Sequence, residues 1–111
     1  MMTANEYQQL VLRTAGTNED GDLMVNGVMG LAGESGECVD LVKKMLFQGH
    51  PLNHEHLAKE LGDVAWYLAV TSHAIGYTLD EVFQMNVDKL LARYPDGFSE
   101  DRSRNREEGD L

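Results

Sequence analysis

The stretch GLAGESGECVDLVKK, residues 30–44, decides the fold class of this chain. Its apolar residues Leu31, Val39 and Val42 recur at the spacing that places side chains on one face of an α-helix. The same period extends over residues 23–47, and the loop QGHPLN at 48–53, which contains a glycine and a proline, ends it. We therefore expect a long helix here. Strand signals are few anywhere in the chain.

Four glycines interrupt this expected helix at every third position: Gly27, Gly30, Gly33 and Gly36. Each costs about 1 kcal/mol relative to alanine inside a helix, so another effect must compensate. Close approach of a neighbouring helix is one explanation, and a break into two helices is another. A third is access of a ligand or a metal to the backbone beside the nearby glutamates.

Other helix boundaries are marked by short signals. Thr3, Asn53 and the T-x-x-E capping box that begins at Thr78 predict three further helix starts. Gly76 and Pro95 mark two helix ends. Together these signals predict an all-α, four-helix bundle-like fold with short connections, one of them the turn-rich segment GTNEDG at 16–21. Residues 1–98 are expected to form a single domain, and the charged residues 99–111 a flexible tail.

The charge balance excludes several partners. The 111 residues include 19 acidic and 9 basic ones, giving a net charge of −10. Nucleic acids and anionic membrane surfaces need a basic protein surface, so neither is an expected partner. The longest apolar run, residues 64–70, is far shorter than the roughly 20 residues that cross a membrane. No signal peptide and only one cysteine, Cys38, are present, so we expect a cytoplasmic protein.

Four carboxylates carry the expected chemistry. Glu34 and Glu37 are three residues apart in one expected helix, and Glu60 and Asp63 are three apart in the next. Residues at this spacing share a helix face, so two antiparallel helices can direct all four toward one cavity. Oxygen ligands of this kind suit Mg²⁺, with Mn²⁺ as a substitute. Alternatively, these acids only solvate helix faces, as pairs at this spacing often do.

Three ordered motifs resemble those of a known family. GLAGESGECVDLVKK (30–44) followed by KELGDVAWYL (59–68) is similar to the E-x-x-E…E-x-x-D signature of the MazG-type nucleotide pyrophosphohydrolases. NVDKLLARYPDGF (86–98) resembles the closing motif of that family, and EYQQLVLRTA (6–15) its first helix. The resemblance covers nearly everything except the tail.

The resemblance implies Mg²⁺-dependent hydrolysis of nucleoside triphosphates, with ribose or deoxyribose, to the monophosphate and pyrophosphate. It also implies a homodimer or homotetramer and assigns both metal binding and catalysis to the four carboxylates. One glutamate would act as base toward the attacking water, but the sequence does not identify which. The expected substrate-binding residues follow from the same motifs and from helical spacing: Lys44, Asn86, Lys89 and Arg93.

Two rival functions stay open at this point. The chain could be a non-catalytic all-α module that binds a cation or a protein partner, or it could act on another phosphate ester. The four histidines are interpreted as loop or surface residues, because none forms the Glu-x-x-His pair of a di-iron bundle. Trp66 is interpreted as a core residue.

Overall fold

The computed structural model describes residues 1–16 and 20–111, and all regular structure in these residues is helical. The helices are α1 (Ala4–Leu12), α2 (Asp20–Gln48), α3 (His54–Ala74), α4 (Leu79–Arg93) and α5 (Glu100–Arg104). The all-α prediction is confirmed. The turn expected at 16–21 falls mainly on 17–19, which lie outside the described residues. None of the described helices combines the length and hydrophobicity that a membrane crossing requires.

The chain forms two compact units, Met1–Leu79 and Asp80–Leu111, which are described separately. The first contains α1, α2 and α3. The second contains α4 beyond its first residue, together with α5. The expected single domain over residues 1–98 and the expected dimer or tetramer stay predictions.

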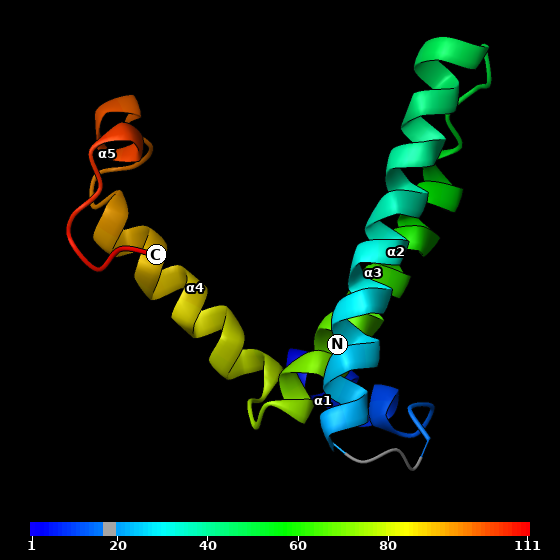
Figure 1. Ribbon diagram of the computed structural model, residues 1–111, viewed down its shortest axis with the longest axis horizontal. Helices are drawn as coiled ribbons and strands as arrows, with labels where there is room; N and C mark the ends of the chain where they lie inside the picture. Colours follow the sequence, from blue (N-terminus) through cyan, green and yellow to red (C-terminus); the bar gives the residue numbers. More distant parts are fainter. Residues whose placement is uncertain (17–19) are drawn as a thin grey trace. The chain divides into compact units, whose positions relative to one another are not determined.

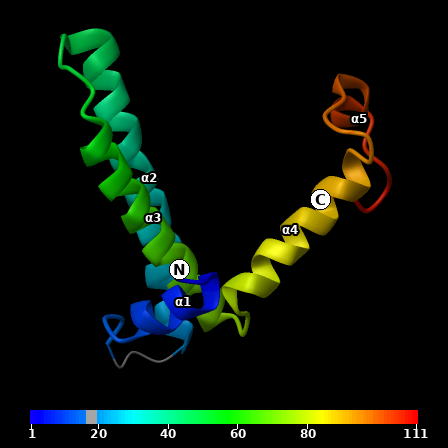
Figure 2. The ribbon, with the colours of Figure 1, turned by 180° about the vertical axis from the view of Figure 1, so that it is seen from behind.

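The long helices α2 and α3 lie side by side as a hairpin, seen from both sides in Figures 1 and 2. The glycines of α2 explain part of this close approach. A methyl group on Gly27 would meet the Thr71 hydroxyl, and one on Gly30 would meet the Tyr67 ring. Gly33 and Gly36 have open space instead. Close packing is therefore the reason for two of the four glycines, and α2 continues through all of them without a break.

Local capping interactions fix both ends of α3. The Asn53 side chain accepts a hydrogen bond from the His56 N–H at 3.0 Å, as the sequence predicts. At the other end Gly76 has a φ of +90°, a conformation that glycine adopts without strain. The Gly76 N–H donates to His73 at 2.9 Å and the Tyr77 N–H to Ser72 at 2.9 Å, the hydrogen-bond pattern of a Schellman motif.

The core of the first unit lies where α1 packs on the C-terminal half of α3. Val70 is fully buried at its centre. Trp66 packs against this core and donates its indole N–H to the Thr14 hydroxyl at 2.8 Å, which agrees with its interpretation as a core residue. The buried Gln8 side chain of α1 joins the segments by donating to the carbonyls of Ala69 and Tyr77 at 3.1 and 3.2 Å.

The second unit includes the charged residues 99–111. Composition predicts a flexible tail, but Ser99 caps the short helix α5 by accepting from the Arg102 N–H. Further along, Asp110 forms two hydrogen bonds with Arg93 of α4. Charged residues of this segment therefore pair with one another and with α4, and its expected flexibility stays a prediction.

Candidate metal centre

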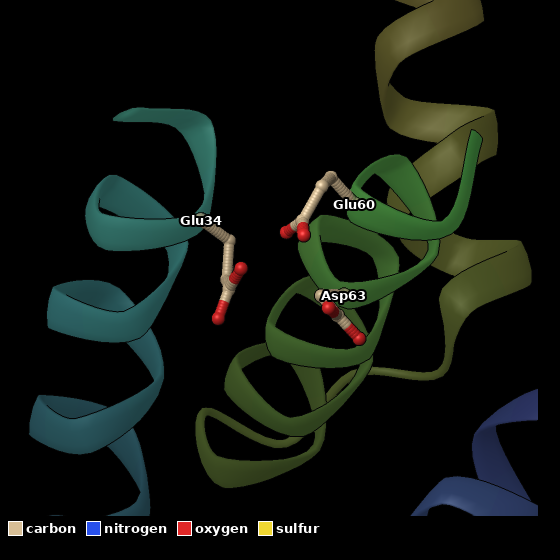
Figure 3. A group of neighbouring side chains, drawn as sticks. All are labelled: Glu34, Glu60 and Asp63. Carbon is tan, nitrogen blue, oxygen red and sulfur yellow. The ribbon is translucent and has the colours of Figure 1, made fainter. Parts of the chain in front are cut away.

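Three carboxylates from α2 and α3 converge on one point of the hairpin. Glu34 comes from α2, and Glu60 and Asp63 come from successive turns of α3. Figure 3 shows the Glu34 and Glu60 side chains directed toward each other, with Asp63 beside them. One oxygen from each of the three lies within 4.8 Å of the others. These three carboxylates therefore lie on the sides of α2 and α3 that face each other.

The surroundings of Glu34 in this cluster disfavour its ionised form. The pKa of Glu34 is raised by partial desolvation, by a hydrogen bond with the Glu60 carboxyl group, and by the negative charges of Asp63, Glu60 and Glu37. None of the described Lys or Arg residues forms an ion pair with Glu34, Glu60 or Asp63. A group of converging acids that has no Lys or Arg partner among the described residues fits a divalent cation with oxygen ligands.

Glu37 is not one of the three converging residues. It is exposed, one turn beyond Glu34, and its charge contributes to the raised pKa of Glu34. Its predicted role as a fourth ligand stays a prediction.

Two residues that sequence reasoning did not single out contact the cluster or its backbone. The Nε2 atom of His56 lies 3.3 Å from a Glu60 carboxylate oxygen, one helical turn away. The Tyr7 hydroxyl donates a long hydrogen bond, 3.5 Å, to the carbonyl of Gly62, next to Asp63. Burial and then the Asp63 charge raise the pKa of Tyr7. The H-x-x-x-E spacing could have revealed His56, whereas no local pattern links Tyr7 to α3.

The expected substrate-binding residues have other surroundings. Lys44 forms an ion pair with Asp40 on its own helix at 2.9 Å, and this contact raises the Lys44 pKa. Asn86, Lys89 and Arg93 all lie on α4 in the second unit. Asn86 and Lys89 are exposed, whereas Arg93 is largely covered by its pairing with Asp110.

Comparison with known proteins adds the family context. The model of the MazG nucleotide pyrophosphohydrolase domain matches residues 26–98, which include the three converging carboxylates. The Gene 37 protein of Mycobacterium phage L5 is 38% identical over 82 residues, which cover 70% of this chain and 72% of that protein. No solved structure matches the chain significantly.

Proposed function

The chain belongs to the MazG nucleotide pyrophosphohydrolase family, and we propose that it hydrolyses nucleoside triphosphates to the monophosphate and pyrophosphate with Mg²⁺. The observation that carries this proposal is the convergence of Glu34, Glu60 and Asp63 inside the matched region. A nucleoside triphosphate and a carboxylate cluster repel each other unless a cation lies between them. The substrate class therefore agrees with the cluster only if a divalent cation is present.

Glu34, Glu60 and Asp63 would hold the cation, with Glu37 as a further ligand from the next turn of α2. When bound, Mg²⁺ or its substitute Mn²⁺ neutralises the triphosphate and offsets the charge that develops as the phosphoanhydride bond breaks. A glutamate of the cluster would take the proton from the attacking water. His56 would orient the Glu60 carboxylate through their 3.3 Å contact.

The cationic and amide residues would hold the phosphate chain and the nucleoside. Lys44, Lys89 and Arg93 carry the positive charge that phosphate oxygens require, and the Asn86 amide offers both a donor and an acceptor. For two of these residues, substrate competes with an existing carboxylate partner: Asp40 for Lys44 and Asp110 for Arg93.

A homodimer or homotetramer forms part of the same proposal. Large apolar side chains at every fourth position of α4 are exposed: Phe83, Val87 and Leu91. Contiguous exposed apolar surface is typical of a protein–protein contact. Sedimentation-velocity centrifugation tests this part, because a monomer at micromolar concentration would contradict it.

The activity test is a panel of nucleoside and deoxynucleoside triphosphates incubated with the protein and Mg²⁺, with detection of pyrophosphate. We expect pyrophosphate release with at least one nucleotide, and loss of that release when Mg²⁺ is chelated. Asp63→Asn should abolish turnover while the helical circular dichroism stays unchanged. Glu55→Gln is the matched control, since Glu55 is an exposed acid of the same helix that forms an ion pair with Lys59, away from the three converging carboxylates.

Two outcomes would contradict the proposal. If no nucleotide releases pyrophosphate, the chain is not a pyrophosphohydrolase, and cation binding without turnover would favour a non-catalytic module. If Asp63→Asn and Glu55→Gln retain equal activity, the site lies elsewhere.

A further inference from the structure

The second unit contains a cavity between the C-terminal part of α4 and the segment that follows α5, which we call the α4–α5 cavity. Its volume is about 420 Å³. Its charged lining consists of four cationic and three acidic side chains: Lys89, Arg93, Arg102, Arg106, Glu107, Glu108 and Asp110. Four of the nine basic residues of the chain therefore line this cavity, and its charged side chains sum to +1 in a chain of net charge −10.

The Asp110 carboxylate accepts hydrogen bonds from the Arg93 guanidinium in this cavity. The Arg93 guanidinium donates from Nε to one Asp110 oxygen and from Nη2 to the other, both at 2.8 Å. Only 10% of the Arg93 side chain and 15% of the Asp110 side chain are exposed. The hydrogen bonds from Arg93 lower the pKa of Asp110, and the charges of Arg93, Arg106 and Lys89 act in the same direction. The carboxylate is therefore ionised at neutral pH.

This geometry is that of an anion site filled by the chain itself. Two parallel N–H donors from one guanidinium match two oxygens of a carboxylate and equally two oxygens of a phosphate. Without Asp110, the lining would have four cationic and two acidic side chains. A phosphate group with two negative charges would compensate that excess better than one carboxylate.

We propose that Arg93, with Lys89 and Arg106, forms a phosphate-binding site in the α4–α5 cavity, and that Asp110 is an internal competitor for it. The inference rests on the proposed function only in the choice of a phosphate chain as ligand, since Lys89 and Arg93 are also proposed substrate-binding residues. Phosphate can then bind only those molecules in which Asp110 has left Arg93. The apparent affinity for phosphate is lower than the intrinsic affinity in proportion to that fraction.

The attachment of Asp110 allows such competition. Asp110 lies outside any helix, in a turn in which its N–H donates to the Glu107 carbonyl at 3.1 Å. Gly109, immediately before it, has a φ of +87°. Releasing the carboxylate therefore unwinds no helix. A tethered group of this kind competes at an effective concentration in the millimolar range, so a submillimolar ligand must bind more tightly than the carboxylate does.

The test is isothermal titration calorimetry with inorganic pyrophosphate in the presence of a chelator, so that the acidic cluster of the first unit has no cation to recruit the ligand. Asp110→Asn keeps the shape of the side chain and removes its charge, and we expect about tenfold tighter pyrophosphate binding. Glu108→Gln makes the same charge change in the same cavity without touching Arg93, and should alter the affinity less than about twofold. Arg93→Ala added to Asp110→Asn should remove the gain.

A second measurement uses the unmodified chain. The Arg93 Nε–H resonance should shift when pyrophosphate replaces Asp110. The proposal is overturned if this resonance is unmoved at saturating pyrophosphate, if Asp110→Asn binds no more tightly than the unmodified chain, or if Glu108→Gln gives an equal gain. Neither assay involves hydrolysis. A failure of nucleotide turnover would therefore contradict the proposed function, whereas the binding measurements alone decide whether Asp110 competes with phosphate for Arg93.

Discussion

Glu34 of α2 and Glu60 of α3 face each other in a cluster completed by Asp63, in which one carboxylate oxygen of each residue lies within 4.8 Å of the others. Desolvation and the neighbouring carboxyl groups of Glu60 and Asp63 raise the pKa of Glu34, because they disfavour its charged form. The relationship connects the stability of the metal-free chain to pH.

Glu34→Gln should stabilise the metal-free protein at neutral pH. In the folded chain the Glu34 pKa is raised above its ordinary value of 4.5. The folded state therefore binds this proton more tightly than the unfolded state, and stability falls as pH rises from about 4.5 through the raised value. We expect a higher Tm for the variant at about pH 7, and no difference below about pH 4. Thermal unfolding in a chelator at several pH values measures this. Glu55→Gln is the control, and a variant Tm at or below that of the parent at neutral pH would contradict the argument.

His56→Ala should weaken Mg²⁺ binding without unfolding the helix. The imidazole holds the Glu60 carboxylate from one turn away, and loss of such a partner costs on the order of tenfold in metal affinity. Calorimetric titration with Mg²⁺ measures the loss. His56→Gln, which retains a donor on a side chain of similar reach, should recover part of it. His54→Ala provides the matched change on the same helical turn, and an equal loss there would show that His56 has no positioning role.

Gly30→Ala and Gly33→Ala should change stability in opposite directions. The added methyl group at position 30 meets the Tyr67 ring, which has to move, whereas position 33 has open space around it. Alanine in a helix interior stabilises the folded state by about 1 kcal/mol relative to glycine when its methyl group meets no other atoms. Urea unfolding should therefore show a loss for the first variant and a gain of up to that size for the second. A gain at both positions would mean that the close approach of α2 and α3 does not require Gly30.

Gln8→Leu should destabilise the first unit by about 3 kcal/mol, because it leaves buried polar groups without partners. The Gln8 amide donates to two carbonyls, and its oxygen accepts from the Leu79 N–H at 3.1 Å. Chemical denaturation measures the change. Gln9→Leu, at the neighbouring exposed position, should have an effect within about 0.5 kcal/mol of zero. Similar effects for both variants would contradict a role for the buried hydrogen bonds.

Local sequence signals predicted most helix boundaries because the interactions that fix them are local. Thr3 and Asn53 accept from backbone N–H groups three residues ahead, and Gly76 relieves the strain at the end of α3. Contacts between distant segments had no such signal. Tyr7 of α1 approaches Gly62 of α3, and Asp110 pairs with Arg93; neither contact can be read from composition or local spacing.

The sequence alone determined the helical class and the two acidic pairs, because both depend on spacing along a single helix. It also assigned the MazG-type resemblance through three ordered motifs. Only the tertiary structure decided that Glu34, Glu60 and Asp63 converge while Glu37 lies outside that group. That selection depends on how α2 packs against α3, and the close contacts of Gly27 with Thr71 and of Gly30 with Tyr67 are part of that packing. A helical repeat fixes which residues share a face, but side-chain packing between helices decides which of them meet.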